Sequence, residues 1–301
     1  MDIDAVYTWV DGEDIEHAKL RAQYRNRTKL KRWRDNGELR HSLRSLEMFA
    51  PWFRMIHIVT NGQVPKWLNT DHPKIRLVTH REIYRWPEHL PTFNSVSIET
   101  HLHRIPDLAE HFVYFNDDMF LGNACEKSLF FRQGGRIRVS RHGRLPLRAK
   151  NANRDEMYIG GQRHARSLLA SEFGSAYTFR PNHQAKPYTK GLLIAAEKRW
   201  PNIAEANSRS RFRAASDVAM NMGVWNNFAA ATRRGVFSGF GGMCIGVGKS
   251  ARKAKIRFEK AFAARPQLLC INDSGIGKGT RPILQDFLER YYPTPCGMEL
   301  S

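Results

Sequence analysis

Two Asn-Asp motifs follow apolar runs of the sequence, and their side chains are those that bind metal ions and phosphates. Asn116, Asp117 and Asp118 follow the run FVYF, and Asn272 and Asp273 follow the run LLCI. Adjacent carboxylates beside a buried strand are costly unless a cation or several hydrogen-bond donors meet them. Because hard oxygen ligands suit Mg²⁺ or Mn²⁺, we expect Asp117, Asp118, Asn272 and Asp273 to form one metal site. A turn with solvated acids is the alternative for each motif.

Other reactive side chains do not stand out by their spacing. Asp11 and Gly12 form an ordinary turn pair after an aromatic run. His183 lies between two prolines and is one of 12 histidines, and a lone histidine is more often structural than catalytic. Arg213 and Asp217 are four residues apart in an expected helix, a spacing that is typical of a surface ion pair.

The first half of the chain has the elements to position these residues. Apolar, β-branched runs predict four strands, at residues 3–10, 55–60, 75–79 and 112–115. Helical periodicity predicts helices at residues 38–50, with Asp35 or Asn36 as the N-cap, at 92–104, and in the basic stretch 14–34. Strands separated by helices predict an α/β fold with an open, mostly parallel sheet. Ligands of such sheets bind beyond the carboxyl ends of the strands, so the tips TWVDG, VTNG and FNDD are expected to converge.

The second half is less regular and strongly basic. Residues 132–166 hold ten Lys and Arg against two acids, and they predict loops with a short strand around Ile137. The remaining expectations are an extended segment at 179–190, a helix at 211–230, a loop or hairpin at 235–248, a strand at 268–271 and a helix at 280–292. We expect one catalytic domain, with a donor-binding half at 1–130 and a basic half at 131–301 that supplies acceptor and catalytic residues.

Composition limits the class of protein. The chain has 301 residues, 42% of them hydrophobic, and 48 Lys and Arg against 29 Asp and Glu, a net charge of +19. These values exclude collagen, a coiled coil, a disulfide-rich miniprotein and wholesale disorder. A chain this basic is expected to meet an anionic partner: nucleic acid, a membrane face, a nucleotide or an anionic polymer.

The cysteines and the N-terminus indicate a cytoplasmic setting. Cys125, Cys244, Cys270 and Cys296 form no C-x-x-C pair, so we expect buried, small hydrophobic residues in a reducing compartment. The sequence shows neither a signal peptide nor a membrane-spanning run. It also lacks the P-loop, dinucleotide-binding and serine-hydrolase motifs.

Four blocks of the sequence resemble the Stealth family. DIDAVYTWVDG (2–12) is similar to its first conserved block. The stretch 34–68 together with LPTFNSVSIETHLHRIPDLAEHFVYFNDDMFLG (90–122) is similar to the long second block. RPNHQAKPYTK (180–190) with RFRAASDV (211–218) resembles the third block, and LLCINDSG (268–275) resembles the fourth. The blocks occur in the family's order and extend over nearly the whole chain.

The resemblance implies a hexose-1-phosphate transferase. Stealth proteins include bacterial capsule-polysaccharide phosphotransferases and the catalytic core of lysosomal-enzyme N-acetylglucosamine-1-phosphotransferase. The implied fold is GT-A-like and binds a nucleotide sugar, usually a UDP-sugar, with a divalent metal. A hydroxyl group of a glycan acceptor attacks the β-phosphorus, sugar-1-phosphate is transferred, and UMP leaves. Because the chain lacks room for the insertions of the eukaryotic relative, we expect a bacterial-type core that acts on a glycan in capsule or cell-surface polysaccharide synthesis.

The resemblance also implies roles for individual residues. His183 is implied as the base that takes the acceptor proton, and Arg213 as a catalytic phosphate clamp; Asp118 is implied as both catalytic and metal-binding. The implied donor-binding residues are Thr8, Trp9, Asp11, Gly12, Arg40, Asn61, Gly62, Asn94, Ser95 and Arg104. The charge suits an acceptor that is an anionic, phosphodiester-linked polymer, and it also suits peripheral association with an anionic inner membrane face.

Three alternatives stay open at this point. A glycosyltransferase with the same donor fold would release UDP instead of UMP. A nucleic-acid-binding protein would fit the charge, but no aromatic-interleaved basic motif or helix-turn-helix pattern supports it, so we expect no nucleic-acid partner. A glycan-binding scaffold without catalysis would bind polymer without needing a metal.

Overall fold

The computed structural model describes residues 1–24, 35–147, 156–239, 241–273, 277 and 279–300. Its strands are β1 (Ile3–Thr8), β2 (Ile56–Thr60), β3 (Ile75–Thr79), β4 (His111–Asn116), β5 (Met119–Leu121), β6 (Ile137–Val139), β7 (Lys186–Thr189), β8 (Gly235–Phe237), β9 (Met243–Val247) and β10 (Leu268–Asp273). Its α-helices are α1 (Ile15–Tyr24), α2 (Glu38–Phe49), α3 (His80–Ile83), α4 (Ser95–Glu99), α5 (Glu156–Phe173), α6 (Lys190–Arg199), α7 (Pro201–Arg209), α8 (Trp225–Ala231), α9 (Ala251–Ala264) and α10 (Arg281–Tyr291). None of the described helices has the length and hydropathy needed to cross a membrane.

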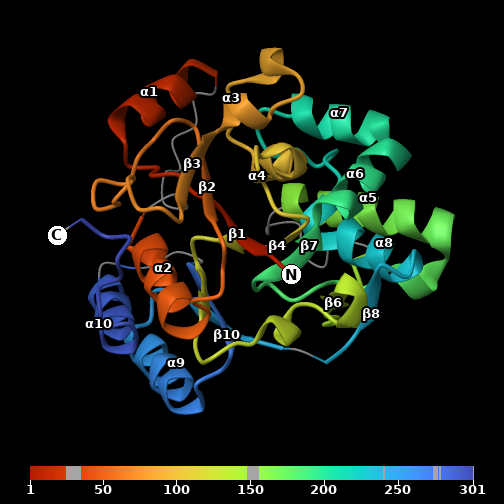
Figure 1. Ribbon diagram of the computed structural model, residues 1–301. Helices are drawn as coiled ribbons and strands as arrows, with labels where there is room; N and C mark the ends of the chain where they lie inside the picture. The colour runs from red at the N-terminus through yellow and green to blue at the C-terminus, as the bar shows by residue number, and fades with distance from the viewer. Residues whose placement is uncertain (25–34, 148–155, 240, 274–276, 278, 301) are drawn as a thin grey trace. The chain divides into compact units, whose positions relative to one another are not determined.

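The α/β class expected from the sequence is confirmed (Figure 1). A five-stranded sheet has the order β3-β2-β1-β4-β7. Strands β1 and β2 pair in parallel, with Val6 opposite His57. Both strands are almost completely buried, as expected for runs that are largely apolar. The four strands expected in the first half all form, with bounds that differ from the expected ones by two residues or fewer.

The chain divides into two compact units. The first unit comprises Met1–Asp4, Val78–Val113 and Lys127–Gly241, and the second comprises Ala5–Leu77, Tyr114–Glu126 and Gly242–Ser301. The units interleave along the sequence, so neither coincides with residues 1–130 or with residues 131–301.

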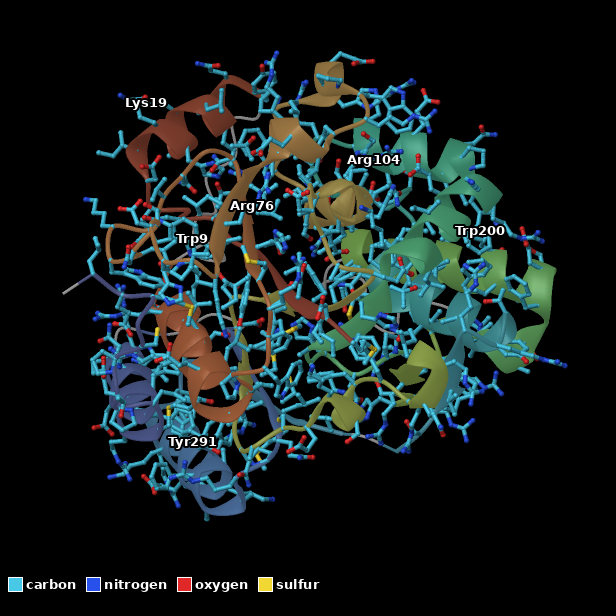
Figure 2. The ribbon with its side chains drawn as sticks, viewed as in Figure 1. Trp9, Lys19, Arg76, Arg104, Trp200 and Tyr291 are labelled. Atoms are coloured by element: carbon cyan, nitrogen blue, oxygen red, sulfur yellow. The ribbon has the colours of Figure 1, made fainter. Side chains whose placement is uncertain are left out.

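The second unit contains a three-stranded sheet covered by two helices. Strand β10 is its centre, antiparallel to β5 and parallel to β9. Helices α9 and α10 lie side by side (Figure 1), and their apolar faces pack with Phe120, Ile245 and Leu269 in one buried cluster. At one end of this cluster, Tyr291 (labelled in Figure 2) lies beneath the guanidinium of Arg265, 4.3 Å from the ring centre.

Helix α2 is fixed in the second unit by buried polar contacts. The hydroxyl of Tyr7 on β1 bonds to the Ser42 hydroxyl at 2.7 Å, which in turn donates to the carbonyl of Met119 at 2.5 Å. The Arg44 guanidinium donates to both carboxylate oxygens of Glu299, at 2.6 and 3.1 Å. The contacts of Ser42 hold the helix against β1 of the five-stranded sheet and against β5 of the three-stranded sheet.

The first unit is mainly helical. Helices α6 and α7 pack on each other, and α8 contacts α5 and α6. Aromatic side chains fill the space between these helices, as in the contacts of Trp200 (labelled in Figure 2) with Phe173 and Phe228. Strands β6 and β8 form a separate parallel pair.

The expected helix at 211–230 is wrong for its first nine residues. A π-helical turn starts only at Met220, and it continues into α8. The reason is that side chains occupy the backbone groups of the preceding segment. The Asn207 amide accepts from the backbone N–H of Val218 and donates to its carbonyl, both at 2.9 Å, and Asp217 accepts from the N–H of Ala214. Such local bonds compete with a helix.

Four other expectations need correction. The expected helix at 92–104 is split into α4 and a 3-10 turn, Leu102–Arg104. The expected loops at 132–166 end at Glu156, where α5 begins; residues 148–155 lie outside the described residues. The segment expected to be a loop or hairpin at 235–248 holds β8 and β9, which belong to different sheets. Cys244 is exposed, whereas the other three cysteines are buried as expected.

The N-cap of α2 is Gly37, not Asp35 or Asn36 as expected. Gly37 has a left-handed φ of 86°, a conformation that favours glycine. The Asp35 carboxylate accepts from the N–H of Gly37 at 2.7 Å. This leaves Asp35 in the turn that leads into the helix. Of the expected basic helix at 14–34, α1 covers Ile15–Tyr24, and residues 25–34 lie outside the described residues.

Candidate functional site

A cavity of about 420 Å³ opens in the second unit beside the start of α2. Two of its lining residues, Asp11 and Arg40, are among those that the sequence analysis assigned to donor binding. Its lining is strongly charged and comprises Asp11, Glu13, Asp35, Asn36, Gly37, Arg40, His41, Trp67, Arg281, Gln285 and Glu289.

The loops after β1 and β2 are bonded to each other at this cavity. The N–H of Asp11 donates to the Gln63 side chain, and the Gln63 amide donates back to the Asp11 carbonyl, both at 3.0 Å. Gly62 has a φ of 105°, which a side chain would strain, and its N–H donates to the Thr60 hydroxyl at 3.0 Å. The Asn61 amide bonds to a ring nitrogen of His17 at 2.9 Å. The sequence therefore holds the tips TWVDG and VTNG together, as expected for converging strand ends.

A chain of hydroxyl groups links the tips of β1 and β4. The Thr8 hydroxyl bonds to the Tyr114 hydroxyl at 2.8 Å, and that hydroxyl donates to the Asn116 amide oxygen, also at 2.8 Å. The N–H of the neighbouring Trp9 donates to the carbonyl of Val59 at 3.0 Å. These bonds fix the backbone immediately before Asp117 and next to Asp11.

The structure places Asp117 and Asp118 in the turn between β4 and β5, next to β10, which carries the second Asn-Asp motif. β5 and β10 pair antiparallel with Cys270 opposite Met119, and the N–H of Ile271 donates to the Asp118 carbonyl at 2.9 Å. Asn272 therefore follows directly after the residue that bonds to Asp118. The backbone arrangement agrees with the expectation that motifs more than 150 residues apart meet; metal binding by Asp117, Asp118, Asn272 and Asp273 stays a prediction. The side chain of Asp273 lies outside the described part of the structure.

The carboxylates around Asp117 repel one another. Burial, followed by the negative charges of Asp118, Glu38 and Asp35, raises the pKa of Asp117 well above its ordinary value, although part of the residue remains open to solvent. Burial also raises the pKa of Glu38 to about 7, against hydrogen bonds from Asn36 that favour its charged form. Burial raises the pKa of Asp35 as well. A group of carboxylates with raised pKa values is the environment in which a cation is most strongly favoured.

The donor set fits a hard divalent cation. Among the described side chains, its oxygens are those of Asp117 and Asp118 in the turn before β5 and of Asn272 near the end of β10. Mg²⁺ and Mn²⁺ prefer such carboxylate and amide oxygens. The mutual repulsion at Asp117 is the observation that supports the fit, because a bound cation would relieve it.

Arg40 has a partner that the sequence analysis did not foresee. Its guanidinium donates to Glu299, which also binds Arg44. Burial opposes ionisation of Glu299, but hydrogen bonds from Arg44, from the N–H of Cys296 and from Arg40 outweigh it and lower the pKa to about 2. Arg40 is therefore held by a carboxylate at the wall of the cavity, with 37% of its side chain exposed.

A second group of candidate residues meets in the first unit. Arg213 donates to the Ser95 hydroxyl at 2.8 Å and lies 5.6 Å from the ring centre of Tyr158. Asn94 caps α4 and donates to the Asp217 carboxylate at 3.0 Å. Ser95, Arg213 and Asp217 line a small cavity of about 30 Å³. The structure thus brings together Asn94, Ser95 and Arg213, which the sequence analysis named separately.

Close packing of two glycines positions the loop that carries Arg213. A side chain at Gly160 of α5 would come within 2.6 Å of the Ala215 carbonyl oxygen, and one at Gly161 within 3.3 Å of the Asp217 carbonyl oxygen. Only glycine at Gly160 therefore lets α5 approach this loop so closely.

Arg104 and His183 are the two remaining candidates in the first unit. Arg104 donates to both carboxylate oxygens of Glu197, at 2.7 and 2.9 Å, and His103 contacts the same carboxylate at 2.6 Å. His183 is partly buried in the segment before β7. The structure gives Arg104 an ion-pair network as its immediate environment and does not place it among the residues around Arg213.

Sequence reasoning missed several residues of these groups. Asp35 was considered only as a helix cap, and Glu38 and Gln63 were not singled out. Asp217 was considered only as a surface partner of Arg213, whereas it is 3% exposed and bonds to Asn94. A signal existed for Asp35 and Glu38, because two acids flank a helix start without any basic residue among them.

The family models and the curated relatives that match this chain agree with each other. Conserved region 1 of Stealth proteins matches residues 1–29, and conserved region 2 matches residues 32–139. An exopolysaccharide phosphotransferase of Streptomyces coelicolor is 37% identical, over 99% of this chain and 57% of the relative. The exopolysaccharide phosphotransferase CpsY of Mycobacterium tuberculosis is 33% identical, over 99% of this chain and 58% of the relative. The chain thus spans a little more than half the length of these curated relatives.

Two of the solved structures to which this chain is similar are glycosyltransferases. The galactosyltransferase LgtC, in complex with donor and acceptor sugar analogues, matches with a TM-score of 0.47 and 9% identity, over 96% of both chains. Mouse xyloside xylosyltransferase 1 matches with a TM-score of 0.42 and 12% identity, over 90% of this chain and 98% of the other.

Proposed function

Because the chain is a member of the Stealth family, as conserved regions 1 and 2 show, we propose that it transfers a hexose-1-phosphate from a UDP-sugar to a glycan hydroxyl. UMP is the other product, and N-acetylhexosamine-1-phosphate is the group we expect to be transferred. The observation that carries this proposal is the match of 99% of the chain to exopolysaccharide phosphotransferases. We place the reaction in capsule or exopolysaccharide synthesis.

The second unit is proposed to bind the donor in a GT-A-like manner. Its cavity of about 420 Å³ is within the size range of small-molecule sites. Asp11 and Arg40 line it, and the paired loops of Asp11 and Gln63 give it a fixed wall. The other residues proposed for the donor are Thr8, Trp9, Gly12, Asn61 and Gly62 in this unit, and Asn94, Ser95 and Arg104 in the first.

A divalent cation is part of the proposal. Asp117, Asp118, Asn272 and Asp273 would hold Mg²⁺ or Mn²⁺, which when bound supplies positive charge for the donor's diphosphate. The carboxylates of Asp35 and Glu38 lie close enough to Asp117 to raise its pKa. Their negative charge strengthens binding of a cation and, without one, would repel the diphosphate.

The chemistry of the transfer is assigned to His183 and Arg213. His183 accepts the proton of the acceptor hydroxyl as that oxygen forms its bond to the β-phosphorus. Arg213 donates two N–H groups to phosphate oxygens, where negative charge develops as the bond to UMP breaks. Ser95 and Tyr158 hold the guanidinium in place before substrate arrives, so little side-chain entropy is lost on binding.

The decisive experiment identifies the nucleotide product. The protein is incubated with a panel of UDP-sugars, Mg²⁺ or Mn²⁺ and glycan acceptors, and the released nucleotides are separated by chromatography. Release of UMP with phosphorus in the glycan product supports the proposal. Release of UDP shows a glycosyltransferase instead, and metal-independent polymer binding without turnover shows a scaffold. Salt-sensitive DNA binding without turnover of any UDP-sugar shows a nucleic-acid-binding protein.

We also propose that helix α9 attaches the protein peripherally to an anionic membrane. Ile256 is 59% exposed, and helical spacing places Arg252, Lys253 and Lys260 around it. None of these three cations has an ion-pair partner among the residues that the structure describes, and Glu259 of the same helix is paired with Arg290 at 2.9 Å. An exposed apolar side chain surrounded by cations suits a lipid surface better than a soluble polyanion.

A further inference from the structure

Two thiols of the second unit face each other across neighbouring strands. Cys244 on β9 and Cys270 on β10 are register partners in a parallel pair. Their neighbours Ile245 and Ile271 belong to the apolar cluster beneath α9 and α10. Because side chains alternate along a strand, Cys244 and Cys270 both point to the opposite face of the sheet. The side-chain contact with Cys244, followed by burial, raises the pKa of the Cys270 thiol well above its ordinary value.

The spacing of the strands permits a covalent bond between these sulfurs. Neighbouring strands lie about 4.8 Å apart, and disulfides join Cα atoms about 4.4–6.8 Å apart. Register partners of a parallel pair do not turn their Cβ atoms toward each other, so a disulfide between them requires a local shift of the strands and is strained. Strained disulfides are reduced easily.

One thiol of the pair also contacts a candidate site residue. The Cys270 sulfur lies 3.6 Å from Oδ2 of Asp118, to which it donates a weak hydrogen bond. Cys244 is exposed and Cys270 is buried, so an oxidant in solution reaches Cys244 first. The arrangement has the parts of a thiol switch: an accessible cysteine, a resolving cysteine beside it, and a functional carboxylate beside the second.

We propose that Cys244 and Cys270 are a reversible oxidation site, at which hydrogen peroxide forms an intramolecular disulfide. Peroxide oxidises the Cys244 thiol to a sulfenic acid, and one water is released as the O–O bond breaks. The Cys270 sulfur then attacks the Cys244 sulfur, the S–S bond forms, the S–O bond breaks, and a second water leaves with the remaining thiol proton. Two thiols are oxidised by two electrons in total, and a dithiol reductant reverses the change.

The disulfide removes the hydrogen bond to Asp118. A sulfur in a disulfide has no proton to donate, so the Asp118 carboxylate loses its hydrogen bond from Cys270. The Cys270 sulfur also moves when it bonds to Cys244. On the proposed function, Asp118 binds the cation, and oxidation therefore weakens cation binding and lowers turnover. This last step rests on the proposed function, whereas formation of the disulfide does not.

Peptide mapping tests the oxidation site. The intact chain is treated with hydrogen peroxide, alkylated with N-ethylmaleimide and digested for mass spectrometry. We expect the thiols available for alkylation under denaturing conditions to fall from four to two, with a linked peptide that contains Cys244 and Cys270; dithiothreitol restores all of them. Cys125→Ser and Cys296→Ser should still form the link. A link to another cysteine, a chain-to-chain link, or sulfinic acid at Cys244 without a link overturns the proposal.

Cation binding and turnover test the consequence. Cys244→Ser, which lies outside the candidate metal-binding residues, should bind Mn²⁺ like the unmodified protein and keep this affinity in peroxide. The unmodified protein should lose at least about tenfold in Mn²⁺ affinity when oxidised, as measured by electron paramagnetic resonance. If the link forms and Mn²⁺ affinity does not change, the coupling to Asp118 is wrong. Absence of turnover with every UDP-sugar would refute the proposed function and leave the mapped link intact.

Discussion

Replacement of Asp117 is predicted to have opposite effects on stability and on function. Its raised folded pKa means that the folded protein holds the proton of Asp117 more tightly than the unfolded chain does. Stability from this group is therefore present at low pH and is lost as the pH rises from about 4 through the folded pKa. At neutral pH without a cation, Asp117 therefore destabilises the fold.

The first prediction follows from this sign. Asp117→Asn should raise the melting temperature of the metal-free protein at pH 7, abolish the further rise that Mg²⁺ gives the unmodified protein, and reduce turnover by at least about 10²-fold. Differential scanning fluorimetry with EDTA or Mg²⁺ measures the first two effects. Asp71→Asn, in an exposed turn, is the control. A variant that keeps its full response to Mg²⁺ would remove Asp117 from the metal site.

The second prediction separates His183 from Arg213. His183→Ala should lose about 10²- to 10⁴-fold in the chemical step, as expected for a general base, while donor affinity stays the same. Its residual rate should rise with pH because deprotonation of the acceptor no longer depends on the histidine. Arg213→Lys should not restore the activity that Arg213→Ala loses, because an ammonium group cannot make the bidentate hydrogen bonds of a guanidinium.

Single-turnover rates and calorimetric donor affinity measure these losses. His142→Ala, an exposed histidine of the same unit, is the control for the first variant, and Arg209→Lys, paired with Glu205 on the surface, for the second. Loss of donor binding in His183→Ala together with an unchanged rate in Arg213→Ala would show both assignments to be wrong.

At the scale of elements, the strands could be predicted and the loops could not. The runs at β1, β2 and β4 are largely apolar, with Asp4 and His57 as exceptions, and burial on both sides is the usual cause of such a run. The segment 211–219 has a helix-like pattern, yet Asn207 and Asp217 bind its backbone. Those contacts depend on where α7 ends, which a local pattern does not contain.

The candidate site was predictable to the same extent. The Asn-Asp motifs could be recognised in the sequence because each directly follows an apolar run. The pairing of β5 with β10 then brings the two motifs close together. The influence of Asp35 and Glu38 on Asp117 depends on how α2 packs against β5. This packing is set by Ser42 and Arg44 through residues distant in sequence, so no local signal contains it.

The third prediction concerns α9. Ile256→Ser should weaken binding to vesicles that contain anionic phosphatidylglycerol about five- to tenfold, since burial of an isoleucine is lost. Lys253→Glu with Lys260→Glu should weaken it at least tenfold, because each cation contributes about 1 kcal/mol near the surface. Vesicle co-sedimentation measures both effects.

Two controls make this test specific. Val64→Ser changes another exposed apolar residue outside α9 and should have no effect on vesicle binding. Inorganic polyphosphate should bind the unmodified protein and Ile256→Ser equally. If Ile256→Ser weakens neither interaction and the double variant weakens both, α9 binds a soluble polyanion and the membrane proposal is refuted.

The fourth prediction concerns the attachment of α2 to the C-terminal segment. The folded pKa of Glu299 is depressed to about 2, so its stabilising effect is full above the unfolded value near 4.3 and is lost as the pH falls through about 2. Glu299→Gln should therefore destabilise the protein at pH 7, and the difference from the unmodified protein should shrink between about pH 5 and pH 2. Chemical unfolding across this range measures it.

The control for Glu299 is an exposed ion pair. Glu259→Gln breaks the ion pair with Arg290, in which both side chains are about half exposed. Ion pairs on the surface contribute little to the free energy of unfolding. Its effect on the free energy of unfolding should be small at every pH. A destabilisation by Glu299→Gln that stays constant from pH 7 to pH 2 would show that lost packing, not charge, explains it.

For the whole molecule, the net charge of +19 leads to the fifth prediction. A strongly positive protein attracts an anionic donor from a distance, and salt screens this attraction. On the proposed function, kcat/KM for the UDP-sugar should fall about tenfold between 25 and 250 mM NaCl, while kcat changes little. Inhibition by uridine, which carries no charge, should be insensitive to salt. Equal salt effects on uridine and the UDP-sugar would refute electrostatic capture.

The contact between Arg44 and Glu299 also has a consequence for synthesis of the chain. The two residues are 255 positions apart, and ribosomes add about 5–20 residues per second. Arg44 therefore leaves the ribosome roughly 10–50 seconds before its carboxylate partner exists. During that interval the polar side of α2 cannot be buried as it is in the finished fold, because an unpaired guanidinium stays hydrated. A nascent chain captured before Glu299 emerges should thus expose α2 to protease, and release of the completed chain should protect it.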